Sequence, residues 1–260
     1  MQLTIVTTAG RPDETSKRLA QHAASLLQYE IKERNKRSVA KMQEAYQANV
    51  IVAGKERYEY FAFGQTEPFF YHPNSAAFRI KRLAKGEQET LIDACQLQEG
   101  DSFLDCTLGI GSDSLVAAFV VGDKGRVVGV EANKNVAFIV KEGMQTYDTS
   151  ELPLTNCMRM IEVHHAHAVA FLKEQQENSF DIVYMDPMFE QIIQEASNFE
   201  ALRAAGEHDP LTAEWVKEAS RVAKRRVVLK AHFESPYFEQ FGFTQLKRQT
   251  AKFHYGVLEV

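Results

Sequence analysis

Three short stretches of the sequence contain residues whose types and spacing could do chemistry. In DIVYMDPMF, residues 181–189, an apolar run meets Asp186, Pro187 and, two positions on, Phe189. A carboxylate offers acceptor oxygens, a proline fixes the turn and removes one backbone donor, and a flat ring can stack on a base. These groups suit a planar exocyclic amine held by the Asp186 carboxylate and the Pro187 carbonyl. The structural alternative is an acid that ends a strand, with Phe189 in the core.

A second stretch, DCTLGIGSDS, follows another apolar run at residues 105–114. Gly109 and Gly111 permit a tight turn and let a ligand approach the backbone closely. Ser112 or Asp113 is expected to cap the helix that follows. A glycine pair alone is a weak signal, so its meaning depends on what the next strand brings.

Glu131 stands twenty residues after Gly111, at the end of the apolar run RVVGVEA. An acid at this place accepts hydrogen bonds from the two hydroxyls of a ribose, which indicates a nucleoside cofactor. A dinucleotide fingerprint would have glycine at Ser114, and Asp113 at the helix start is unfavourable for a pyrophosphate. The same acid suits an amino group and a sulfonium charge. The pattern favours S-adenosylmethionine over a nicotinamide or flavin cofactor and over a purely structural turn.

The third stretch places His164, His165 and His167 near the end of an expected strand. A His-x-His pair on a strand can bind a metal, but no carboxylate or cysteine cluster nearby completes such a site. We therefore expect no metal. One histidine is expected to line an adenine pocket while the others cap or pack.

The elements that position these residues alternate between strand and helix from residue 73 onward. Near-continuous apolar strands separated by helices indicate a parallel sheet covered on both faces. The last two strands form an expected antiparallel pair on this α/β sheet, and by fold analogy such an ending is typical of the Rossmann-like class I methyltransferase sheet. Residues 71–95 read mostly as helix. We expect residues 1–72 to form a separate small α/β module and residues 73–260 to form the S-adenosylmethionine-dependent methyltransferase domain.

Composition limits the remaining possibilities. The hydrophobic content of the 260 residues is 45%, which is ordinary for a soluble globular protein. Their net charge of -5 excludes a globally basic nucleic-acid binder. The three cysteines lack CxxC spacing and are expected to be small buried hydrophobes. Neither a signal peptide nor a membrane-spanning run is evident, so a cytoplasmic protein is expected.

The stretches LDCTLGIGSDS, GVEAN, VHHAHAVA and DIVYMDPMF, in this order, resemble the small-subunit (16S) rRNA guanine-N2 methyltransferases whose fourth motif is DPMF. The resemblance covers roughly residues 95–232 and implies S-adenosylmethionine as cofactor and the N2 amine of an rRNA guanine as methyl acceptor. It implies that Ala132 lies at the ribose position and His167 and Ala168 at the third-strand cofactor position. The candidate cofactor-binding residues are thus Asp105, Gly109, Gly111, Ser112, Asp113, Glu131, Ala132, His167, Ala168 and Asp186, and the candidate catalytic residues are Asp186, Pro187 and Phe189.

Two basic runs suggest a phosphate track for RNA, although such runs are usually solvated helix faces. One lies in the N-terminal module and the other follows it: Lys32, Arg34, Lys36, Arg37 and Lys41, then Arg79, Lys81, Arg82 and Lys85. Two other functions stay open, a methyltransferase of a small molecule or protein and a non-catalytic RNA-binding protein. The sequence leaves the oligomeric state open.

Overall fold

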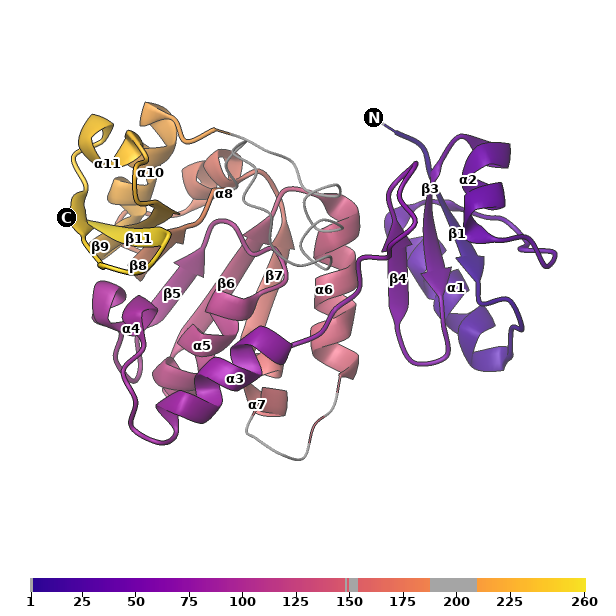
Figure 1. Ribbon diagram of the computed structural model, residues 1–260, viewed down its shortest axis with the longest axis horizontal. Helices are drawn as coiled ribbons and strands as arrows, with labels where there is room; N and C mark the ends of the chain where they lie inside the picture. The colour runs from indigo at the N-terminus through magenta and orange to yellow at the C-terminus, as the bar shows by residue number, and fades with distance from the viewer. Residues whose placement is uncertain (1, 148, 150–153, 188–209) are drawn as a thin grey trace. The chain divides into compact units, whose positions relative to one another are not determined.

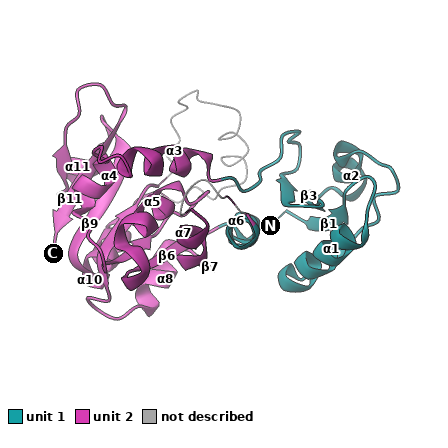
Figure 2. Ribbon diagram, turned by 90° about the horizontal axis from the view of Figure 1, so that it is seen from below, with its two compact units in different colours: residues 1–72, 133–146, 193–206 teal, residues 73–132, 147–192, 207–260 magenta. Residues whose placement is uncertain are grey.

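The protein is described by a computed structural model over residues 2–147, 149, 154–187 and 210–260 (Figure 1). These described residues form two compact units (Figure 2). The first contains residues up to 72 and a helix at 133–146, and the second contains the rest of the described chain. The helix therefore groups with the N-terminal segment, although the strand that precedes it belongs to the second unit.

The first unit consists, in chain order, of β1 (Thr4–Thr8), α1 (Glu14–Leu27), β2 (Glu30–Ile31), α2 (Val39–Tyr46), β3 (Asn49–Ala53), β4 (Tyr58–Phe61) and α6 (Lys134–Thr146). Its sheet has the order β2-β1-β3-β4; β4 runs antiparallel to β3, and the other neighbours are parallel. Helix α1 packs against β1 and β3, α2 against β3, and α6 against β4. The expected α/β character of this segment is thus present.

Local sequence signals account for the helices of this unit. Asp13 caps α1 as predicted: its side chain accepts from the Ser16 backbone N–H at 2.8 Å, and the Ser16 hydroxyl accepts from the Asp13 N–H at 2.9 Å. Such a reciprocal pair satisfies two backbone donors at the helix start. Apolar residues of α2 and the sheet close a small core made of Ile5, Met42, Ala48, Val50, Val52 and Phe61.

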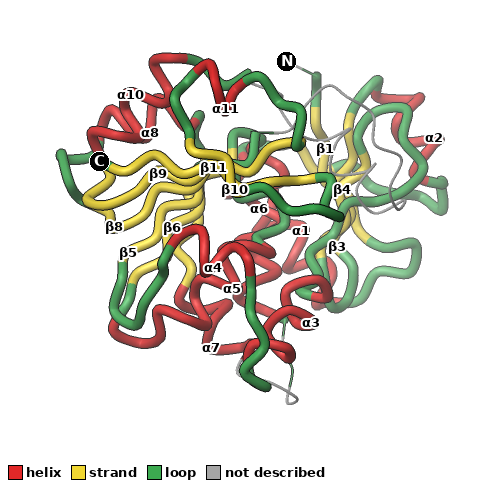
Figure 3. The backbone as a smooth tube through the Cα atoms, turned by 60° about the vertical axis from the view of Figure 1, so that its left-hand side comes forward, coloured by secondary structure: helices red, strands yellow, loops and turns green. Residues whose placement is uncertain are grey.

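The second unit is built on a seven-stranded sheet (Figure 3). In chain order its strands are β5 (Ser102–Asp105), β6 (Arg126–Glu131), β7 (Ile161–His165), β8 (Phe180–Met185), β9 (Ala223–His232), β10 (Thr244–Leu246) and β11 (Phe253–Glu259). Their order is β10-β11-β9-β8-β5-β6-β7, with β5 to β9 parallel and β11 antiparallel to both neighbours. The chain moves outward from β5 to β7 and returns to β8. In open α/β sheets, ligands bind at this reversal, outside the carboxyl ends of the strands.

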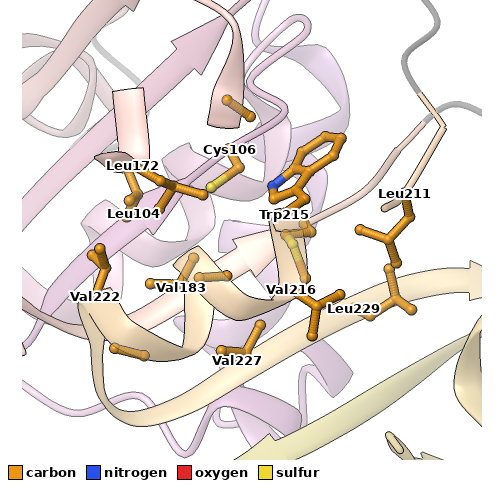
Figure 4. Packing of buried hydrophobic residues seen from close by; sticks show 14 of the residues in the cluster. Leu104, Cys106, Leu172, Val183, Leu211, Trp215, Val216, Val222, Val227 and Leu229 are labelled. Carbon is orange, nitrogen blue, oxygen red and sulfur yellow. The ribbon is translucent and has the colours of Figure 1, made fainter. Parts of the chain in front are cut away.

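Helices cover both faces of this sheet (Figure 1). They are α3 (Asn74–Leu83), α4 (Thr90–Cys95), α5 (Ser112–Val121), α7 (Leu154–Met160), α8 (Ala168–Glu174), α10 (Ala213–Val222) and the short α11 (Tyr237–Gln240). Helix α5 packs on β5 and β6 and is itself covered by α3 and α7, while α8 and α10 cover the other face. Figure 4 shows the core on that face, where Trp215 and Val216 of α10 pack with Val183 and Leu229 of the sheet.

The predicted fold class is confirmed, and one local expectation is wrong. Residues 71–95 are mostly helical, as expected, and they form two helices because Gly86 takes a left-handed backbone (φ 79°) between α3 and α4. The strand that carries the histidines was expected at residues 158–165 and begins only at Ile161, because the residues before it complete α7.

Two further expectations concern the whole chain. The three cysteines, Cys95, Cys106 and Cys157, are buried and unbridged, in line with the expectation from their apolar neighbours. Within the described ranges, the helices are all too short or too polar to cross a membrane.

Candidate functional site

The glycine turn after β5 lies at the reversal point of the sheet. Gly109 and Gly111 have φ values of 50° and 78°, the left-handed region that glycine adopts without steric cost. Gly111 is itself the N-cap residue of α5, and no side chain caps this helix. The expectation that Ser112 or Asp113 caps α5 is therefore wrong. Ser112 is the first helical residue, and its neighbour Asp113 is used elsewhere.

Glu131 at the end of β6 is tied to this turn. Its side chain is buried and its Oε2 accepts from the Gly109 backbone N–H at 3.1 Å. The Leu108 N–H donates to the Val130 carbonyl at 2.9 Å, which fastens the turn to β6 a second time. A carboxylate has about four acceptor positions, so Glu131 can hold the turn and still accept from a ribose. Ala132 follows it, partly buried.

Asp105 ends β5 beneath the turn and is almost fully buried, at 1% exposure. Its Oδ2 accepts from the Ser114 hydroxyl at 2.7 Å and its Oδ1 from the Thr107 N–H at 3.0 Å. Burial raises the pKa of Asp105 to about 7, and these two hydrogen bonds only partly oppose the rise. Asp105 is thus a buried acid that titrates near neutral pH.

Asp186 follows β8 and lies beside both the turn and the next strand. Its N–H donates to the Thr107 hydroxyl at 2.7 Å, and its Oδ2 accepts from the Lys230 ammonium at 2.7 Å. The register explains the contact between Asp186 and Lys230. Met185 on β8 pairs with Leu229 on β9, and Asp186 and Lys230 are the residues that follow them. Burial raises the pKa of Asp186, and the charge of Lys230 opposes that rise.

Asp113 links three other elements through its carboxylate. One oxygen accepts from the Arg79 guanidinium of α3, and the other accepts from the Tyr184 hydroxyl at 2.8 Å and from Lys230 at 3.3 Å. Arg79 also pairs with Glu89 at 2.7 Å. Burial acts to raise the pKa of Asp113, but the charges of Lys230 and Arg79 outweigh it and hold the pKa below its usual value. Asp113 was expected to contact the cofactor. In the structure its carboxylate accepts hydrogen bonds from the protein's own Arg79, Tyr184 and Lys230.

The remaining predicted residues lie at the same strand ends. The Ala166 N–H donates to the Glu131 carbonyl at 3.1 Å, which brings the end of β7 to the cofactor side. His167 is exposed at the N-cap position of α8, and Ala168 is buried in the core. Pro187 is buried, whereas Phe189 lies outside the described residues. Across the described chain, no three His, Cys, Asp or Glu side chains are grouped closely enough to hold a metal ion.

The three residues that hold the Asp113 carboxylate were not predicted as site residues: Arg79, Tyr184 and Lys230. Arg79 lay within a basic run interpreted as a surface, and Tyr184 within an apolar strand. The available signal was that a buried acid needs a partner, so Asp113 beside a buried turn required cations from elsewhere.

The groups at this edge fit S-adenosylmethionine. Gly109 and Gly111 carry no side chains in the turn that Glu131 holds, and a buried carboxylate there suits ribose hydroxyls. The Asp186 carboxylate lies beside the same turn and strand ends, which suits a cofactor that carries an ammonium and a sulfonium.

Comparison with known proteins agrees with this assignment. Residues 68–255 match the family described as "Putative SAM-dependent methyltransferase". The chain is also 41% identical over 255 residues to the uncharacterized protein YpiP of Bacillus subtilis, covering 98% of this chain and 99% of that protein. The chain therefore belongs to this family and is an S-adenosylmethionine-dependent methyltransferase.

A solved structure supports the fold. The methyltransferase NGO1261 of Neisseria gonorrhoeae superposes with a TM-score of 0.63 over 98% of this chain and 95% of that one, at 19% sequence identity. A partial relative is the ribosomal RNA small subunit methyltransferase J of Acinetobacter baumannii, 32% identical over 115 residues. That match covers 44% of this chain and 39% of the relative.

Proposed function

We propose that the protein transfers a methyl group from S-adenosylmethionine to the exocyclic N2 amine of a guanine in small-subunit rRNA. The observation that carries the proposal is the position of Asp186 at the end of β8, hydrogen-bonded through its N–H to the turn residue Thr107 at 2.7 Å. Asp186, the proposed hydrogen-bond acceptor for the substrate amine, is thereby connected to the turn that would hold the cofactor. The side chain of Asp186 remains 29% exposed, so it can be reached by a substrate.

The residues of this edge divide the work. S-adenosylmethionine supplies an electrophilic methyl group on a sulfonium. The Asp186 carboxylate and the Pro187 carbonyl accept from the two N–H groups of the amine, which orients the nitrogen lone pair. Because a planar amine is a weak nucleophile, alignment at about 3–3.5 Å contributes much of the acceleration. The methyl–sulfur bond breaks as the methyl–nitrogen bond forms, and S-adenosylhomocysteine is the leaving group. The methylated amine then passes its extra proton to water, so no group has to act as a base beforehand.

The choice of rRNA rests on two similarities. The DPMF sequence at residues 186–189 resembles that of guanine-N2 methyltransferases. The partial relative from Acinetobacter baumannii is named for the small-subunit ribosomal RNA. The matched region spans 44% of this chain, which supports a catalytic unit shared with that relative. The target nucleotide does not follow from this match and is part of the proposal.

The test is transfer of a labelled methyl group to 16S rRNA and to small ribosomal subunits from cells that lack this protein. We expect label in N2-methylguanosine after nuclease digestion. Asp186→Asn should lower kcat by about 100-fold or more, because it exchanges a carboxylate acceptor for an amide that also donates.

A matched control is Asp181→Asn, on the same strand at the opposite end of the sheet, where Asp181 pairs with Lys224 at 3.3 Å. This variant should retain wild-type activity. Binding of S-adenosylmethionine without label in any RNA would refute the rRNA substrate, and label in a protein or small molecule would favour that acceptor class.

A further inference from the structure

Two ion pairs join β8 to β9 in similar ways at opposite ends of the strands. Asp181 pairs with Lys224 near the start of both strands, and Asp186 pairs with Lys230 near their carboxyl ends. The first pair is at the surface, with the Lys224 side chain 43% exposed. The second is more enclosed, with Lys230 25% exposed, and it touches the proposed acceptor site. Only the second pair can therefore influence the reaction.

Lys230 is held by a second acid from another element. Its ammonium lies 3.3 Å from Asp113 Oδ2, and Asp113 is in turn fixed by Arg79 and by the Tyr184 hydroxyl. Burial alone would lower the pKa of Lys230, but Asp113 and Asp186 raise it, so the side chain stays cationic. A cation fixed from two sides is a rigid partner for Asp186.

The contact is selective for one oxygen of Asp186. Lys230 binds Oδ2, and no other described side chain hydrogen-bonds to either carboxylate oxygen of Asp186. An ammonium on one oxygen sets the rotation of the carboxylate plane. It thereby determines where the other oxygen, Oδ1, is presented to a substrate.

We propose that Lys230 is a positioning residue that fixes the carboxylate plane of Asp186 and favours its ionised form, so that Oδ1 accepts from the methyl-acceptor amine. Asp113 then serves as the anchor of Lys230 and not as a cofactor ligand. The proposal rests on the proposed function for its catalytic consequence, but the state of Asp186 is a property of the protein alone.

The surroundings of Asp186 explain why one cation matters. Charged and titratable groups face it from six elements or loops, and most of them are acids or phenols: Lys230, Asp113, Arg79, Tyr255, Tyr184 and Asp105. The Arg79 cation is already engaged by Asp113 and Glu89. Without Lys230, burial and the nearby Asp113 charge would both disfavour the ionised form of Asp186. Only the more distant Arg79, among the groups named above, would oppose them. Its protonated form, which presents an O–H donor to the amine, would then be favoured.

The experiment compares Lys230→Met with Lys230→Arg and the matched control Lys224→Met. Carbon-13 NMR of the side-chain carboxyls follows Asp186 across pH without substrate, with its signal assigned by loss in Asp186→Asn. We expect the Asp186 titration to move to higher pH in Lys230→Met, and to stay near the wild-type position in Lys230→Arg and Lys224→Met.

Activity provides the second readout. Lys230→Met should lower kcat by about 100-fold at neutral pH, with partial recovery at high pH, and Lys230→Arg should restore much of kcat. An unchanged Asp186 titration in Lys230→Met would overturn the proposal, as would a loss confined to cofactor affinity. If wild-type protein methylates no RNA, the proposed function fails while the NMR result still decides the role of Lys230.

Discussion

At the scale of single residues, Asp105 shows how a buried carboxyl couples the site to pH. It ends a central strand, is almost fully buried, and accepts from Ser114 and Thr107. Its pKa of about 7 in the folded chain lies well above the ordinary 3.8 of the unfolded chain. The folded state therefore binds more protons than the unfolded state between these two values. Stability from this group is fully present below about pH 4 and is lost as pH rises through about 7.

We predict that Asp105→Asn flattens the pH dependence of stability. Each unit of pKa difference corresponds to about 1.4 kcal/mol, so the wild-type protein should lose several kcal/mol more than the variant between pH 4 and 7. Urea denaturation of cofactor-free protein at a series of pH values measures the free energy of unfolding. Asp181→Asn serves as control because the pKa of Asp181 is lowered, which confines its effect to more acidic pH. Identical slopes for Asp105→Asn and wild type would contradict the prediction.

At the scale of elements, the turn depends on a close approach between Leu108 and β6. A Cβ added to Gly129 would lie 2.5 Å from Leu108 Cδ1, closer than atoms tolerate. Leu108 is 4% exposed and its N–H is bonded to β6, so the side chain has little room to move. The glycine on β6 thus permits the packing that seats the cofactor turn.

We predict that Gly129→Ala destabilises the protein by about 1–3 kcal/mol, the usual cost of overpacking, and weakens S-adenosylmethionine binding because the turn is displaced. Urea denaturation and isothermal titration calorimetry give the two quantities. Gly10→Ala is the control, since nothing lies within 4 Å of an added Cβ there. Combined with Leu108→Ala, Gly129→Ala should cost less than the sum of the single changes; strict additivity would argue against a clash.

The elements also show what sequence reasoning could and could not supply. The cap of α1 was predictable because Asp13 and Ser16 are three residues apart. The use of Asp113 was not, because its partners Arg79 and Lys230 are 34 and 117 residues away in sequence. Cap preferences describe a local competition for backbone donors. The buried Asp113 carboxylate instead pairs with two cations that are distant in sequence, and this ionic interaction is stronger than a helix cap. The local capping preference therefore did not predict the role of Asp113.

At the scale of the whole molecule, the order of the strands explains why the site was largely predictable. Glycine turn, Glu131 and Asp186 each follow an apolar strand, and parallel strands bring their carboxyl ends to one edge. Sequence order alone therefore predicts that they meet. It could not predict Lys230 beside Asp186, because this requires the exact register of β8 on β9.

The basic run of the N-terminal unit has members with different surroundings. Arg34 donates to the Arg37 and Thr8 carbonyls, and Arg37 donates to the Glu33 carbonyl and the Tyr46 hydroxyl. These two arginines therefore stabilise the local backbone through their hydrogen bonds, which is a structural role. Lys36 and Lys41 are exposed and are therefore the better candidates for phosphate contacts.

We predict that Lys36→Glu with Lys41→Glu weakens RNA binding and leaves the Kd for S-adenosylmethionine unchanged. If each lysine neutralises one phosphate, the slope of log K against log salt concentration should fall by about 1 per lost contact. Fluorescence anisotropy with 16S rRNA fragments at several salt concentrations measures both. Lys17→Glu is the control, because Lys17 is exposed on α1 of the same unit and pairs with Glu14. Equal weakening by the control would indicate a general charge effect, and an unchanged affinity and slope would exclude these lysines from an RNA surface.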